Sequence, residues 1–179
     1  ALVDRAYAEV LEAGVSVKRP LLGVMIEVPA AVYQANALAK RMDFIAVGSN
    51  DLTQYMLAVD RNNPRVAELY QDFHPAVLAA LRDVGRAAHR HEKPLGICGE
   101  MAGTPMGAVL LMGMGYHVLS MNATNLPRVK WVLRNISRKA ARRMVARSLR
   151  MLTAEEVLEY LQSELREQGL GRVLPQARE

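Results

Sequence analysis

The chain has 179 residues, 51% of them hydrophobic, and a mean hydropathy of +0.01, which is typical of a globular protein with a hydrophobic core. No apolar run approaches the roughly 18 residues that a membrane-spanning helix needs, so we expect no membrane partner. The formal net charge of +5 arises from residues 138–150, which hold six basic residues and no acid. Because aromatic residues make up only 5% and no nucleic-acid-binding motif is present, we expect no nucleic-acid partner.

Apolar runs alternate with helical patterns along the first 137 residues. In chain order, the runs that predict strands are 21–28, 43–48, 95–98 and 118–121. The patterns that predict helices lie between and around them, at 7–13, 30–41, 64–70, 75–91, 104–114 and 126–135. This alternation predicts an α/β protein built of βα units on a parallel sheet. Eight units at this spacing would take about 250 to 280 residues, the size of a TIM (β/α)8 barrel.

The last part of the chain departs from this alternation. The run Thr153-Ala154-Glu155-Glu156 has the form of a capping box at the start of a helix. Apolar residues then follow at helical spacing, at Val157, Leu158, Leu161 and Leu165. We therefore divide the chain into a β/α domain at 1–137 and a C-terminal helical appendage with its tail at 138–179.

Polar or reactive side chains follow all four expected strands, at Glu27, Asn50 and Asp51, Cys98, and Asn122. The carboxyl ends of parallel strands meet at one edge of the sheet, where the sites of α/β proteins form. An unpaired carboxylate at the end of a buried strand is costly to desolvate. Glu27 and Asp51 together therefore suit a hard cation such as Mg²⁺, which takes one or two carboxylates and completes its shell with water and substrate oxygens.

Arg61 and Cys98 are two further candidates for chemistry. The Arg61 guanidinium could bind a phosphate or carboxylate bidentately, although a surface arginine in a loop is the alternative. Cys98 is the single cysteine, which excludes a disulfide within the chain and suits a reducing cytoplasm. A thiol is mostly protonated near neutral pH, so Cys98 can give a proton to a carbanion and take it back. The alternative role of nucleophile would require a neighbouring histidine, and the four histidines show no such spacing.

Three segments carry a resemblance to a known family: GVMIEVP at 23–29, GSNDLTQY at 48–55 and CGEMAG at 98–103. They resemble the phosphoenolpyruvate (PEP)-utilising enzymes, and most closely the PEP–protein phosphotransferases of the bacterial sugar phosphotransferase system. The segment NATNLPRVKW at 122–131 looks like the nitrogen-regulatory branch of these enzymes. The resemblance implies a TIM barrel that binds PEP and Mg²⁺ and forms a homodimer through this domain.

The resemblance also implies a role for each candidate residue. Glu27 and Asp51 match the metal ligands of the family, and Asn50 with the backbone at Asp51 matches contacts to the substrate phosphate. Arg61 matches an arginine that binds the same phosphate. Cys98 matches the acid that protonates C3 of the enolate and so yields pyruvate. The phosphoryl group would pass to a histidine and then to an HPr-like histidine phosphocarrier protein.

Two features of the family are absent from the sequence. No histidine lies in the Thr-Ser-His context of the phosphoaccepting residue, and the arginines of the earlier barrel strands are missing. We therefore expect the last four βα units of a barrel plus C-terminal helices, inactive in isolation, with open strand edges that favour pairing with another chain. Two alternatives remain: the C-terminal domain of a pyruvate phosphate dikinase or PEP synthase, and a non-catalytic dimerisation module.

Overall fold

The computed structural model describes residues 2–174, and a parallel sheet lies at its centre. Its strands are β1 (Gly23–Ile26), β2 (Phe44–Gly48), β3 (Leu95–Cys98) and β4 (Val118–Ser120), paired in the order β1-β2-β3-β4. Each strand therefore pairs with its neighbour in the chain, as expected for successive βα units. The predicted α/β class with a parallel sheet is confirmed, and a closed TIM barrel stays a prediction.

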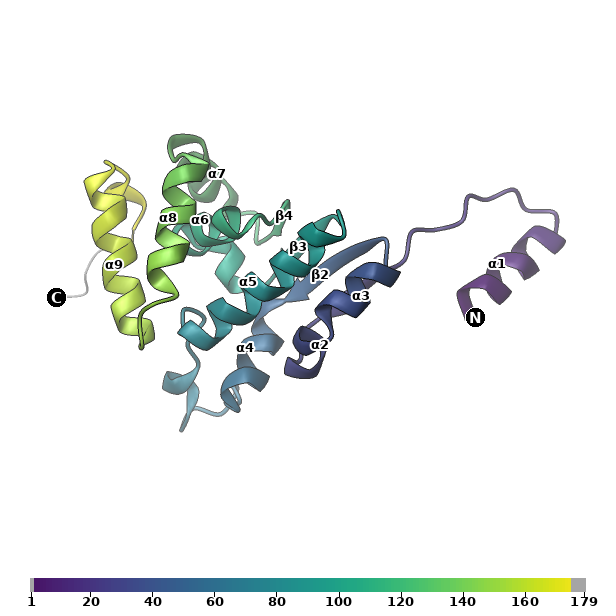
Figure 1. Ribbon diagram of the computed structural model, residues 1–179, viewed down its shortest axis with the longest axis horizontal. Coiled ribbons are helices and arrows are strands. Elements are labelled where there is room, and N and C mark those ends of the chain that lie inside the picture. The colour runs from purple at the N-terminus through teal and green to yellow at the C-terminus, as the bar shows by residue number, and fades with distance from the viewer. Residues whose placement is uncertain (1, 175–179) are drawn as a thin grey trace.

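Helices pack against one face of this sheet (Figure 1). They are α2 (Pro29–Tyr33), α3 (Ala35–Arg41), α5 (Pro75–Arg90) and α6 (Pro105–Met114). The strands turn every second side chain toward these helices, so Ile26, Ile45, Val47, Leu95 and Ile97 are buried. The longest helix, α5, meets them with an apolar stripe of Val77, Leu81, Val84 and Ala88. This packing forms the core beneath the carboxyl edge of the sheet.

The other face of the sheet is left uncovered by residues 2–174. Met25, Phe44 and Val118 are 47%, 38% and 60% exposed there. They line an open apolar hollow of about 340 Å³ together with Gly96 and Cys98. Parallel sheets are normally covered on both faces, so an exposed face of this composition calls for a further partner.

Helix α7 (Leu126–Asn135) closes the segment predicted as β/α units, and α8 (Arg138–Ser148) and α9 (Ala154–Glu167) follow it in the predicted C-terminal appendage. Helix α8 packs closely on α6, since a Cβ on Gly113 would lie 2.7 Å from the Ala141 carbonyl oxygen. The Thr153 hydroxyl accepts a hydrogen bond from the Glu156 N–H (3.2 Å), as the capping pattern predicted. The division of the chain at residue 137 stays a prediction.

Three helices differ from their predicted form. The one predicted at 64–70 is only a single 3-10 turn, Ala67–Leu69. The first helix of the chain, α1 (Leu2–Glu12), starts before residue 7, buries none of its residues and lies apart from the sheet (Figure 1). It is tied instead to the segment that follows it, because the Tyr7 hydroxyl donates to the Val17 carbonyl oxygen (3.2 Å). The helix predicted at 30–41 is divided into α2 and α3 at Gln34. No helix within residues 2–174 has the length and apolar character to cross a membrane.

Candidate functional site

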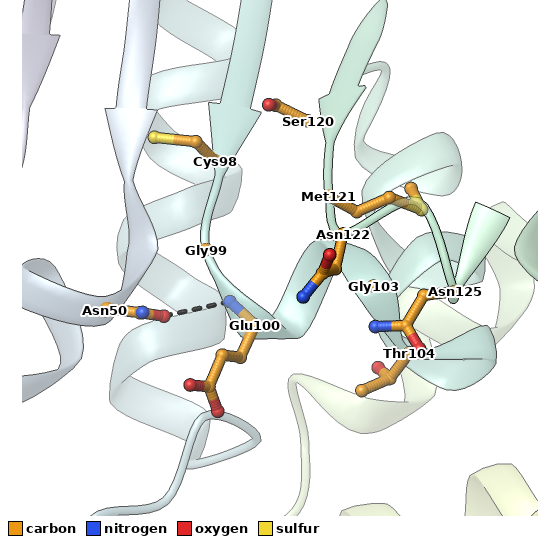
Figure 2. A pocket seen from close by; sticks show the side chains of 10 residues that line it. All are labelled: Asn50, Cys98, Gly99, Glu100, Gly103, Thr104, Ser120, Met121, Asn122 and Asn125. Carbon is orange, nitrogen blue, oxygen red and sulfur yellow. Dashed lines mark hydrogen bonds between the residues drawn. The ribbon is translucent and has the colours of Figure 1, made fainter.

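A polar pocket of about 570 Å³ lies at the carboxyl edge of the sheet (Figure 2). It is formed by the strand ends and the loops that follow β3 and β4. Its lining residues are Asn50, Cys98, Gly99, Glu100, Gly103, Thr104, Ser120, Met121, Asn122 and Asn125. Of the side chains singled out from the sequence, Asn50, Cys98 and Asn122 therefore line one pocket. Glu27, Asp51 and Arg61 lie outside this lining.

Hydrogen bonds join the start of α4 (Ser49–Leu57) to the loop after β3. The Ser49 hydroxyl donates to the Cys98 carbonyl oxygen (3.0 Å), and Asn50 Oδ1 accepts from the Glu100 N–H (2.9 Å; Figure 2). Gly99 has a φ of +131°, and a Cβ there would lie 2.0 Å from Ser49 Oγ. Only glycine allows both contacts at this approach. Because Oδ1 of Asn50 is engaged, its Nδ2 group is the part that can donate to a ligand.

The Cys98 side chain is half-buried and turns toward β2 (Figure 2). Its thiol donates a weak hydrogen bond to the Val47 carbonyl oxygen (3.6 Å), which is a role for the protonated form. The histidines serve elsewhere: His74 caps α5, while His89 and His117 contact backbone near the amino ends of β3 and β4. This arrangement suits a proton donor better than a nucleophile activated by histidine.

Glu27 follows β1 and lies over the end of β2. A Cβ on Gly48 would lie 2.9 Å from Glu27 Oε2 and 3.4 Å from Met25 Sδ, so the absence of a side chain at Gly48 makes room for this carboxylate. Within residues 2–174, Glu27 forms no ion pair or hydrogen bond through its side chain. Its two oxygens are therefore available to a cation.

Asp51 and Arg61 meet at the same edge. Arg61 Nη2 lies 3.6 Å from Asp51 Oδ1, and the Arg61 backbone N–H donates to Gln54 Oε1 (3.5 Å). The loop at 58–74 thus folds back so that Arg61 faces the first turn of α4. Among the residues that the structure describes, no three His, Cys, Asp or Glu side chains gather closely enough to hold a metal ion. A cation here would take its remaining ligands from water and substrate.

A half-buried polar cluster behind Asn50, with only Thr53 fully buried, was not anticipated from the sequence. The Tyr70 hydroxyl donates to the Asn50 carbonyl oxygen (3.1 Å), and the Thr53 hydroxyl donates to Asp72 Oδ1 (3.2 Å). Partial burial raises the pKa of Asp72 above its ordinary value, while the neighbouring hydroxyls of Tyr70 and Thr53 act to lower it. Tyr70 ends the segment predicted as a helix at 64–70 and Asp72 follows it, so the local pattern gave no sign that either side chain turns back to α4.

The comparison with protein families gives the same assignment as the motifs. Residues 1–138 match the family model described as PEP-utilising enzyme, PEP-binding domain. The chain belongs to the PEP-utilising enzymes. Its membership covers the whole sheet and every candidate side chain from Glu27 to Asn122, while α9 lies beyond the matched residues.

Relatives of this PEP-utilising chain carry phosphotransferase names. It is 46% identical over 174 residues to the phosphoenolpyruvate-dependent phosphotransferase system protein of Escherichia coli (strain K12), covering 97% of the chain and 23% of the relative. It is 39% identical over 172 residues to the phosphoenolpyruvate-protein phosphotransferase of Haemophilus influenzae, covering 96% of the chain and 30% of the relative. The chain thus spans under a third of the length of either relative.

Proposed function

We propose that this chain is the PEP- and Mg²⁺-binding part of a PEP–protein phosphotransferase. The observation that carries the proposal is a pair of contacts at the carboxyl edge of the sheet. Asn50 Oδ1 accepts from the Glu100 N–H in the loop after Cys98, and the Arg61 guanidinium lies beside Asp51. These groups offer amide and guanidinium donors beside a thiol and carboxylates, which is a donor set suited to a phosphorylated enol. The names of the relatives in Escherichia coli and Haemophilus influenzae support the same reaction.

Glu27 and Asp51 fit a magnesium ion by their chemistry. Both are hard oxygen donors at the end of parallel strands, and the space over Gly48 leaves the Glu27 carboxylate clear of other side chains. When bound, Mg²⁺ would supply positive charge against the phosphate and enolate oxygens. Arg61 then has two roles: it pairs with Asp51 and presents its remaining N–H groups to the phosphate.

The chain's own residues account for binding and for the proton. Asn50 Nδ2 and Arg61 hold the phosphate while its bond to the enol oxygen breaks and a bond to the acceptor histidine of the full-length enzyme forms. The electron pair of the broken bond stays on the enolate. The Cys98 thiol then gives its proton to C3 to form pyruvate, and the thiolate recovers a proton from water. The phosphohistidine passes its phosphoryl group to an HPr-like carrier.

The open sheet face supports a further part of the proposal, that four more strands complete a TIM barrel and that the enzyme is a homodimer. Met25, Phe44 and Val118 face no described element, and β1 and β4 each leave one edge unpaired. Residues 1–179 produced alone should therefore associate or pack loosely. Size-exclusion chromatography with light scattering checks this, and a compact, monodisperse monomer would contradict it.

The proposed reaction is tested directly with the full-length protein and labelled PEP. We expect Mg²⁺-dependent transfer of the phosphoryl label to a histidine, seen as an acid-labile phosphoprotein, with release of pyruvate. A protein that binds PEP but labels no histidine would contradict the phosphotransferase assignment. Because segment 122–131 resembles the nitrogen-regulatory branch, we propose that branch, and expect faster transfer to its carrier than to the sugar-branch carrier. Equal or reversed rates would contradict that choice.

Gly48→Ala should raise the Mg²⁺ concentration needed for half-maximal pyruvate release about tenfold. The added Cβ would lie 2.9 Å from Glu27 Oε2, so the carboxylate must move from its place over β2. Gly96→Ala on the adjacent strand is the matched control, because its nearest neighbour is Val118 Cβ at 3.6 Å, an ordinary contact. An Mg²⁺ titration compares the two, and equal requirements would argue against Glu27 as a ligand.

A further inference from the structure

The loop that carries Arg61 is held by hydrogen bonds near its C-terminal end, at residues 70–72. Between α4 and α5, three consecutive residues of the loop at 58–74 contact other elements. Tyr70 donates from its hydroxyl to the Asn50 carbonyl oxygen (3.1 Å), and Asp72 accepts from the Thr53 hydroxyl (3.2 Å). Gln71 Nε2 donates to Glu155 Oε1 at the start of α9 (2.8 Å). The loop therefore returns to α4 directly behind the site.

The contacts of Tyr70 and Asp72 both fall on the first half of α4, the helix that carries Asn50. The Asn50 carbonyl oxygen accepts from the Tyr70 hydroxyl, and the Asn50 side-chain oxygen accepts from the Glu100 N–H. Thr53 lies one helical turn further along α4 and is completely buried. At the near end of the loop, Arg61 is placed by Asp51 and Gln54 of the same helix. Helix α4 therefore contacts both ends of the loop at 58–74.

We propose that Tyr70 and Asp72 are positioning residues, which fix the first turn of α4 and the loop at 58–74 so that Asn50 and Arg61 face the phosphate of the substrate. This inference rests on the proposed function and names residues that act through others. Cys98 lies at the end of β3, whose pairing with β2 holds its backbone, and its thiol donates to the Val47 carbonyl oxygen, so its placement depends mainly on the sheet and less on Tyr70 or Asp72.

The burial of Asp72 supports a role beyond stability. Partial burial raises the pKa of its carboxyl in the folded chain above the ordinary value of an aspartate, and the charge of Glu100 raises it further, while Tyr70, Thr53 and Arg61 lower it. A folded pKa above the unfolded value means that ionisation of this group is harder in the fold. The charged group therefore lowers stability near neutral pH and has no such effect at a pH below both values. A residue needed only for folding would be expected to stabilise the fold.

The test uses Tyr70→Phe and Asp72→Asn in the full-length protein. We expect each to raise KM for PEP about threefold to tenfold, with kcat changed less than about twofold. Tyr70→Phe loses its hydrogen bond to Asn50, and Asp72→Asn leaves Thr53 an uncharged and therefore weaker acceptor. Asp72→Asn should also keep or raise Tm at pH 7, since it removes the buried charge. At saturating Mg²⁺ and pyruvate, exchange of the pyruvate methyl protons with solvent, which depends on Cys98, should change less than about twofold in both.

Tyr33→Phe is the matched control, because this tyrosine is 91% exposed on α2. Unchanged KM in both variants would overturn the inference. A joint fall of Tm, kcat and methyl exchange would also overturn it, since it would show a structural role alone. A wild-type protein without PEP turnover would overturn the proposed function and this inference together, whereas an active wild type with unaffected variants overturns the inference only.

Discussion

Cys98→Ala in the full-length protein should slow pyruvate formation about 10²–10⁴-fold, the usual contribution of a positioned general acid. The thiol is half-buried at the end of β3, bonded only weakly to the Val47 carbonyl oxygen, so it can turn to a ligand without breaking a strong contact. Loss of the thiol leaves Asn50 and the carboxylates in place. PEP affinity should therefore stay within about twofold of the wild-type value.

Two measurements check the Cys98 prediction. Pyruvate release gives the rate, and exchange of the pyruvate methyl protons with solvent gives the proton step alone. Cys98→Ser replaces the thiol with a smaller and much less acidic hydroxyl and should retain only a small part of the exchange. If phosphotransfer and exchange both continue at the wild-type rate in Cys98→Ala, the proton role is wrong, and a non-catalytic module becomes the better interpretation.

Gly99→Ala should strongly weaken the binding of PEP. Its added Cβ would lie 2.0 Å from Ser49 Oγ and 2.7 Å from Asn50 Oδ1, at a φ of +131° that side chains rarely adopt. Both hydrogen bonds between α4 and the loop after β3 must then break, at a cost on the order of 1–3 kcal/mol, together with backbone strain of similar size. We expect PEP affinity to fall about 30-fold or more and Tm to fall by several degrees.

Gly169→Ala is the control that separates backbone strain at a positive φ from a steric clash of the added Cβ. Gly169 also has a positive φ, +74°, but a Cβ there meets nothing within 4 Å. It should lower Tm modestly and leave PEP binding unchanged when both variants are measured by calorimetric titration. Equal losses of PEP affinity in the two variants would mean that the joint between α4 and the β3 loop does not place Asn50.

Local patterns in the sequence predicted the elements that have clear end signals. Strand β3 has its predicted bounds, and α6 begins after Thr104, whose hydroxyl accepts from the Gly107 N–H (3.0 Å), and ends at Gly115 with a φ of +89°. The strand predicted at 21–28 is shorter, because only Gly23–Ile26 pairs with β2. Helix α1 begins at Leu2, before its predicted start at residue 7, and none of its residues is buried.

The edge of the sheet that bears the site was predictable, because residues after parallel strands must meet there. The contacts within the site were not, since they depend on the register between strands. Gly48 lies opposite Cys98, and this pairing alone brings Asn50 to the Glu100 N–H. Tyr70 and Asp72 depend in addition on the path of the loop back to α4, which no periodicity specifies.

The most direct test of a Mg²⁺-assisted PEP site at this edge is calorimetric titration of the full-length protein with PEP in Mg²⁺, with Glu27→Gln as the comparison. This change keeps the shape of the side chain over Gly48 and removes its charge. We expect Mg²⁺-dependent binding of PEP by the wild type and a loss of affinity of at least about tenfold in Glu27→Gln, because one of two carboxylate ligands is gone. Equal PEP affinity in the two proteins, with and without Mg²⁺, would contradict a metal-assisted PEP site at this edge of the sheet.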